Sequence, residues 1–228
     1  MVPPLNTLLV FRIEHKDNLA YILEHGMHTR DHTQLNPDHV FIGHTQLTAE
    51  RHEWPVEPCD IGQAEIGTYG TLGQYVPFYF GPRSPMLYVV KNGYNGVQMR
   101  PQRDIVYLCC HFATIAGSGQ RYVFTNGHAK NKLTYYYSRP ENLNQLHWDT
   151  IYSKFWKNTE LEFDRERRKQ AELLVPVHVP PDWIRAIVVH DDEMCTFAQD
   201  IVDRLNHQAK VKVNPADAYN GCGFYYDE

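Results

Sequence analysis

The 228-residue sequence has little that would mark a secreted or membrane-spanning protein. It holds only five cysteines, an odd number at irregular spacing, which argues against a secreted disulfide framework. No hydrophobic run approaches the roughly 18 residues that a membrane span needs. Residues 1–15 also lack the basic leader of a signal peptide. We therefore expect a protein of the reducing cytoplasm, with no signal peptide and no membrane contact.

Metal sites and phosphate-binding loops of the common kinds are missing as well. The 13 histidines include His111, which follows Cys109 and Cys110, but adjacent residues on a strand point to opposite faces and no second pair completes a zinc site. The glycine-rich stretch at Gly117 precedes a predicted strand, whereas a Walker or Rossmann loop lies between a strand and a helix. The sequence therefore predicts no bound metal.

Positive charge is scarce, since the formal net charge is −5. No global field draws the chain to nucleic acid, although a local basic groove would suffice for a single strand. Apolar residues are abundant, at 43% of the chain, and aromatic residues make up 13%. We expect most of these rings to lie in the core or in half-buried sheet, while others are available for stacking on bases.

Strand and helix patterns follow one another without repeats or linkers. The predicted strands are residues 7–13, 74–80, 85–90, 104–110, 121–125, 172–179 and 186–191. The predicted helices fall within 15–27, 46–54, 141–156 and 194–208. Residues 29–39 are polar and aperiodic, which is typical of a loop. The mixed order predicts one α+β domain over residues 1–228.

Three charged features stand out at the ends of predicted elements. Arg12 and Glu14 alternate along a strand and share one face, where they form a salt bridge or line a cleft. Arg51, taken alone, reads as an ordinary surface arginine. Glu172 opens the apolar run ELLVPV, where a carboxylate is costly unless it is partnered or faces a cleft. The basic run before it, residues 165–169, either complements phosphate or is solvated.

Five motifs, in order along the chain, resemble those of the DarT family of DNA ADP-ribosyltransferases, the toxins of toxin–antitoxin pairs. They are FRIEHKDNLAYILEHGM at 11–27, IGHTQLTAER at 42–51, YVPFYFGPRSPMLY at 75–88, VFTNGHA at 123–129 and RRKQAELLV at 167–175. Two positions depart from the family pattern. Arg12 stands where many members have a histidine for the nicotinamide ribose, and Asn126 stands where an aspartate is frequent.

The resemblance implies an α+β ADP-ribosyltransferase fold, with two facing β-sheets, an NAD cleft between them and flanking helices. NAD would be the co-substrate, with no metal, and ADP-ribose would pass to a thymidine or guanosine base of single-stranded DNA as nicotinamide leaves. RNA or protein as acceptor, and a catalytically inactive nucleic-acid-binding relative, stay open as alternatives. The implied partner is an antitoxin that removes ADP-ribose, a macrodomain or similar hydrolase.

The resemblance also implies roles for individual residues. Glu172 and Arg51 would be catalytic, the carboxylate stabilising positive charge at the ribose C1′ as in glycoside hydrolysis. Arg51, a permanently protonated side chain, would clamp the pyrophosphate, polarise a base carbonyl or assist proton loss. The residues implied to bind NAD are Arg12, Ile13, Glu14, Asn18, Leu19, Tyr21, Thr29 and Arg51. Those implied to bind DNA are Tyr75, Arg83, Met86 and His128.

Overall fold

The computed structural model describes residues 1–215 and 218–227. Its strands are β1 (Leu9–His15), β2 (Met27–His28), β3 (Tyr75–Tyr79), β4 (Ile105–His111), β5 (Val123–Thr125), β6 (Tyr136–Tyr137), β7 (Glu172–Pro176), β8 (His178–Val179), β9 (Ile184–Val189) and β10 (Lys210–Val213). Its α-helices are α1 (Leu19–His25), α2 (Thr45–Arg51), α3 (Pro85–Asn92), α4 (Phe112–Gly117), α5 (Trp148–Ile151), α6 (Arg165–Lys169), α7 (Asp192–Arg204) and α8 (Ala218–Gly221). Short 3-10 helices cover Lys16–Asn18, Gln63–Glu65, Leu72–Gln74, Tyr94–Gly96, Gln102–Asp104, Pro140–Gln145 and Pro181–Trp183.

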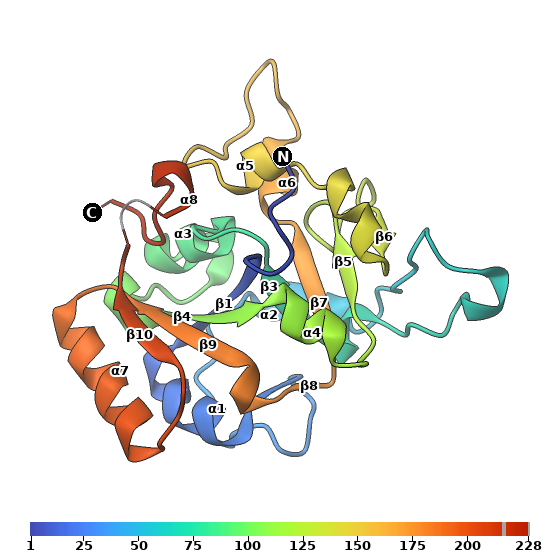
Figure 1. Ribbon diagram of the computed structural model, residues 1–228. Helices are drawn as coiled ribbons and strands as arrows, with labels where there is room; N and C mark the ends of the chain where they lie inside the picture. The colour runs from blue at the N-terminus through green and yellow to red at the C-terminus, as the bar shows by residue number, and fades with distance from the viewer. Residues whose placement is uncertain (216–217, 228) are drawn as a thin grey trace.

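The strands form an eight-stranded sheet in the order β10-β9-β4-β1-β3-β7-β5-β6 and a two-stranded sheet of β2 and β8 (Figure 1). The large sheet has two halves that meet at a narrow seam. β1 pairs with β4 along its whole length and β3 pairs with β7 along its whole length. Between β1 and β3, however, the register consists of the single pair Phe11 and Tyr79. Two facing sheets were predicted, whereas the structure joins two four-stranded halves into one sheet through this pair, and β1 beyond Phe11 has no register with β3.

Both faces of the β1 half are covered. On one face, Val10 and Leu108 belong to a buried cluster that includes side chains of α1 and α7. On the other face, Phe11 and Tyr107 pack with α3 and with residues 224 and 225 near the C-terminus. Because successive side chains of a strand point to opposite faces, β4 is apolar from Ile105 to Cys110, whereas β1 turns polar at Arg12 and Glu14, beyond its pairing with β3.

Residues 85–90 form helix α3, so the prediction of a strand there is wrong. Their apolar and β-branched composition favoured a strand. The residues around them decide otherwise, because the backbone N–H of Leu87 donates to the Ser84 hydroxyl at 3.3 Å and caps the helix. Pro85 occupies the first turn, where its missing N–H costs nothing, and Gly93 ends the helix with a φ of 67°.

The predicted strand 172–179 is divided into β7 and β8, which belong to different sheets. Val177, between them, has a φ of 64°, a left-handed conformation that β-branched residues rarely adopt. Its N–H donates to the Gln74 carbonyl at 2.9 Å, and its own carbonyl accepts from the Thr29 N–H at 3.0 Å. These tertiary hydrogen bonds therefore hold the left-handed conformation at Val177, which divides β7 from β8 and which the sequence pattern does not indicate.

The remaining predictions differ mainly in length. The other five predicted strands are observed as β1, β3, β4, β5 and β9, and three of the four predicted helices as α1, α2 and α7. Residues 141–156 form a 3-10 helix and the one-turn α5 instead of one continuous helix. The Trp148 indole N–H donates to the Leu143 carbonyl at 2.9 Å, which closes the chain into a compact turn.

Candidate active site

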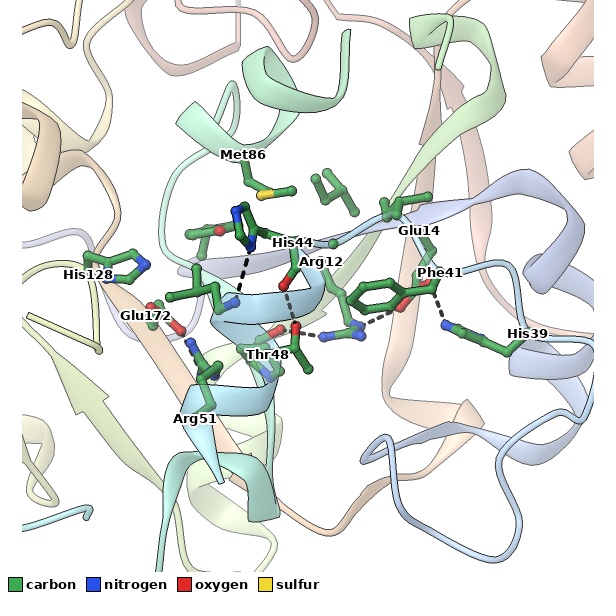
Figure 2. A pocket seen from close by; sticks show the side chains of 16 residues that line it. Arg12, Glu14, His39, Phe41, His44, Thr48, Arg51, Met86, His128 and Glu172 are labelled. Atoms are coloured by element: carbon green, nitrogen blue, oxygen red, sulfur yellow. Dashed lines mark hydrogen bonds and ion pairs between the residues drawn. The ribbon is translucent and has the colours of Figure 1, made fainter. Parts of the chain in front are cut away.

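A cleft opens beside the seam of the large sheet, where β1 runs free of β3. Figure 2 shows Glu172, Arg51 and His128 toward one end of it and Glu14 and His39 toward the other. The residues that line the cleft are Arg12, Ile13, Glu14, His39, Phe41, Ile42, Gly43, His44, Leu47, Thr48, Arg51, Pro77, Tyr79, Met86, His128 and Glu172.

Glu172 is the first residue of β7 and is 2% exposed. One carboxylate oxygen accepts from the backbone N–H of Ala129 at 2.8 Å. The other lies 3.1 Å from the Arg51 guanidinium. Its own backbone N–H donates to the Thr125 hydroxyl at 3.0 Å, which fixes the start of the strand. A buried carboxylate is tolerated here because both of its oxygens have a donor.

Arg51 reaches Glu172 from the last turn of α2. The helix begins because the His44 ring accepts from the Leu47 N–H at 3.1 Å, in the manner of an N-cap. The Thr48 hydroxyl donates to the His44 carbonyl at 3.0 Å within the same turn. A cationic side chain in the last turn also suits the helix dipole. The helix thus carries the guanidinium to the floor of the cleft.

Arg12 and Glu14 lie together further along the cleft, as the strand period predicts. The Arg12 Nε donates to Glu14 at 2.6 Å, and Nη1 donates to the Pro77 carbonyl at 3.1 Å across the seam. Within the described part of the chain, Nη2 of Arg12 donates to no protein acceptor. This guanidinium therefore keeps donor capacity for an anionic ligand.

Asn18 connects this pair to the loop before α2. Its amide donates to Glu14 at 3.1 Å and to the Val40 carbonyl at 3.0 Å, and its side-chain oxygen accepts from the Val40 N–H at 2.8 Å. These contacts hold the loop that brings His39 and Phe41 into the cleft. An amide is suited to this position because it supplies donors and an acceptor at once.

Two histidines in the cleft are kept neutral near pH 7 by their surroundings. Burial lowers the pKa of His128, although the Glu172 charge opposes that effect. Burial likewise lowers the pKa of His39 against the opposing charge of Glu14. Each ring therefore offers one donor and one acceptor near pH 7 and carries no charge.

The structure brings most of the predicted site residues together. Met86 and His128, two of the DNA-binding candidates, line the cleft. Ile13, one of the NAD-binding candidates, lines it as well. Tyr21 and Asn18 line a smaller pocket that shares Arg12, Glu14 and His39 with the cleft.

Four predicted site residues lie elsewhere. Leu19 is fully buried in the main core. Thr29 and Tyr75 line a separate groove; the Tyr75 side chain is mostly buried, and its hydroxyl donates to the Tyr69 carbonyl. Arg83 is 6% exposed, because its guanidinium donates to the carbonyl of Tyr225 near the C-terminus.

Sequence reasoning missed the segment between 39 and 48, which supplies His39, Phe41, His44, Leu47 and Thr48. Residues 42–51 were placed in a family motif and a helix was predicted within 46–54, but none of these five side chains was assigned to the site. Among the described residues, no group of three or more histidine, cysteine or acidic side chains is placed to hold a metal ion. No helix in the same part of the chain is long and apolar enough to cross a membrane.

Solved structures share this architecture. Thermus sp. 2.9 DarT in complex with ADP-ribosylated ssDNA matches with a TM-score of 0.81 at 26% identity, over 93% of this chain and 96% of that one. The same Thermus protein in complex with NAD+ matches with a TM-score of 0.74 at 26% identity, over 93% and 97% of the two chains. The protein therefore has the ADP-ribosyltransferase fold, as the motifs predicted.

Sequence comparison identifies the family within the class of proteins that have this fold. Residues 11–220 match the family described as "ssDNA thymidine ADP-ribosyltransferase, DarT". The DNA ADP-ribosyl transferase of Escherichia coli O127:H6 is 32% identical over 186 residues, which are 82% of each protein. That of Thermus aquaticus is 31% identical over 207 residues, 90% of this chain and 86% of the relative. The chain belongs to the DarT family.

Proposed function

We propose that this protein transfers ADP-ribose from NAD to a base of single-stranded DNA and releases nicotinamide. The observation that carries the proposal is the Arg51–Glu172 pair on the floor of the cleft. Arg12 offers its Nη2 group, which has no acceptor within residues 1–215 and 218–227, to the anionic co-substrate from the β1 side. The Thermus relative with the same fold is described in complexes with NAD+ and with ADP-ribosylated ssDNA, which supports both substrates.

The chemistry follows from the charges. The bond between the ribose C1′ and nicotinamide breaks, and its electron pair leaves with nicotinamide as a neutral molecule. A bond from C1′ to the base forms, and the base releases a proton to solvent. Glu172 stabilises the positive charge that builds at C1′, as carboxylates do in glycoside hydrolysis. Arg51 orients Glu172 and faces the same space, so that its guanidinium polarises the acceptor base. A base must leave a duplex stack to reach such a cleft, which favours a single strand.

The test is incubation with NAD labelled on its adenylate and a panel of acceptors. The panel holds single-stranded oligonucleotides that contain thymidine or guanosine as the sole reactive candidate, duplex DNA, RNA and protein. We expect label on single-stranded DNA, and the two oligonucleotides decide the base. Label on protein or RNA alone would overturn the proposal. NAD binding without nicotinamide release would indicate an inactive relative.

The biological role is inferred from the family. We propose a toxin of the cytoplasm, built as a single domain over residues 1–228, whose modification a partner hydrolase removes. A Thermosipho africanus relative, described as a fusion of a DNA ADP-ribosyl transferase with a DNA ADP-ribosyl glycohydrolase, supports this partner; it is 28% identical over 202 residues, 86% of this chain and 46% of the fusion. Expression should arrest growth, and co-expression of an ADP-ribose-removing hydrolase should restore it. Normal growth without the hydrolase would count against the toxin role.

A further inference from the structure

Arg167 is a mostly buried arginine in α6, just before the strand that carries Glu172. Its Nε and Nη2 donate to the two carboxylate oxygens of Asp164 at 2.7 and 2.6 Å. This bidentate pair neutralises the guanidinium and lowers the pKa of Asp164. The basic run 165–169 was expected to face phosphate or solvent, but at Arg167 it does neither.

The remaining guanidinium nitrogen reaches the loop of residues 126–135. Nη1 of Arg167 donates to the Asn126 side chain at 3.2 Å and to the Thr134 hydroxyl at 3.1 Å, so that it joins the two ends of the loop. The Arg167 carbonyl accepts from the His128 N–H at 2.9 Å. A Cβ on Gly127 would lie 2.3 Å from Nη1, so only glycine admits this approach.

The 126–135 loop in turn touches the candidate catalytic carboxylate. The Thr134 hydroxyl, which accepts from the arginine, donates to the His128 carbonyl at 2.8 Å. The next residue, Ala129, donates its N–H to Glu172 at 2.8 Å. A continuous set of hydrogen bonds therefore runs from the Arg167 guanidinium through the loop to Glu172.

We propose that Arg167 is a positioning residue, which fixes the 126–135 loop so that the Ala129 N–H orients Glu172 and His128 faces the cleft. The inference rests on the proposed function and adds a residue that is not among those lining the cleft. A planar guanidinium is required because one side chain has to bind Asp164 with two donors and the loop with a third nitrogen. An ammonium group cannot hold both.

The test compares Arg167→Lys with the matched control Arg168→Lys. Arg168 lies in the same helix and donates to the same Asp164 carboxylate at 3.0 Å, but within the described chain it makes no hydrogen bond to the loop. We expect Arg167→Lys to lower kcat for transfer to single-stranded DNA by about 10- to 100-fold, the effect of small misplacements in active sites. The Kd for NAD, measured by calorimetry, should not change. Arg168→Lys should resemble the unaltered protein in both measurements.

A second pair of variants keeps the proposal testable if Arg167→Lys fails to fold. Thr134→Val removes the hydroxyl that links Arg167 to the His128 carbonyl, whereas Thr134→Ser retains it. We expect the loss of kcat in the valine variant alone. Rates are measured well below the melting temperature and divided by the concentration of protein that binds NAD. A loss of folded protein therefore does not count as a loss of kcat.

Transfer by Arg167→Lys at the rate of Arg168→Lys, with NAD binding intact, would overturn the inference. So would equal kcat values for Thr134→Val and Thr134→Ser, or a loss of NAD binding that accounts for the whole defect. In each case the unaltered protein modifies DNA, so the proposed function stands. If the unaltered protein modifies no DNA under any condition, the proposed function fails first and this inference falls with it.

Discussion

The Arg51 guanidinium lies 3.1 Å from the Glu172 carboxylate, so that α2 and β7, 121 residues apart in sequence, meet at one ion pair. The pair is largely shielded from water, with the side chains 13% and 3% exposed. Neither charge is stable in such a place alone, because an unpaired buried ion is strongly destabilising. Each residue therefore supplies the charge partner of the other and fixes its orientation.

Replacement of Glu172 by Gln should abolish most transfer while NAD still binds. The amide oxygen can keep the hydrogen bond from Ala129, but the negative charge is lost. We expect kcat to fall about 10²–10³-fold, the usual effect of removing one electrostatic stabiliser. Stability should fall by about 1–3 kcal/mol because Arg51 loses its charged acceptor. Transfer rate, NAD binding and melting temperature are measured on the same sample.

The matched control is Glu53→Gln, which changes an exposed carboxylate two residues after Arg51. It should leave both rate and stability unaltered. A Glu172→Gln protein that modifies DNA at the normal rate would remove this residue from the catalytic machinery.

Replacement of Arg12 by Ala should weaken NAD binding more than it slows the bound complex. Its guanidinium contacts Glu14 and the Pro77 carbonyl in the cleft wall, and its Nη2 has no acceptor among the described residues and is available to an anion. Loss of such ground-state binding raises KM for NAD and leaves kcat nearly unchanged. Steady-state kinetics with saturating DNA measure both. Arg185→Ala, at an exposed position of β9, is the control. A change in kcat alone would assign Arg12 to the chemical step instead.

Replacement of Asn18 by Asp should disrupt the loop before α2. The substitution removes the donors to Glu14 and to the Val40 carbonyl and places a second carboxylate beside a buried one. We expect a KM for NAD about tenfold higher, which corresponds to about 1.4 kcal/mol, and a lower melting temperature. Asn144→Asp, an exposed asparagine, should have neither effect. Unchanged NAD kinetics in the Asn18 variant would show that this loop does not shape the NAD site.

The pH dependence of stability should contain a contribution from His28. Burial first, and then the neighbouring His178 and His32, lower the pKa of this ring to about 4. An unfolded histidine titrates near pH 6.5, so the unfolded chain takes up a proton between pH 6.5 and 4 that the folded chain does not. This contribution to stability is constant above pH 6.5 and decreases as the pH falls through that window.

The variant His28→Phe tests this linkage. A phenyl ring keeps the stack between His32 and His178, whose ring centroids lie 4.6 and 4.5 Å away, and cannot bind a proton. We expect its melting temperature to decline less between pH 7 and pH 4.5 than that of the unaltered protein. His52→Phe, which changes a partly exposed histidine outside this cluster, should follow the unaltered curve. Identical curves for all three proteins would exclude His28 as the titrating group.

Local patterns in the sequence were sufficient for five of the seven predicted strands, observed as β1, β3, β4, β5 and β9, and for the relation between Arg12 and Glu14. A strand places alternate residues on one face whatever surrounds it, so the shared face followed from the two-residue period alone. The cost of a carboxylate at the start of an apolar run likewise marked Glu172 as a residue that needs a partner. For residues 85–90, the strand prediction rested on apolar composition, although the sequence also contained a helix start at Ser84 and Pro85.

Only the tertiary structure decided which partners these residues have. Arg51 meets Glu172, Arg167 meets Asn126, and Arg83 donates to Tyr225 in the C-terminal segment, and each of these contacts joins residues far apart in the sequence. The loop that carries His39 and Phe41 has no periodicity and acquires its position from Asn18. Side-chain period and burial cost act between neighbours in the chain, whereas these contacts join residues whose approach depends on the packing of the whole sheet.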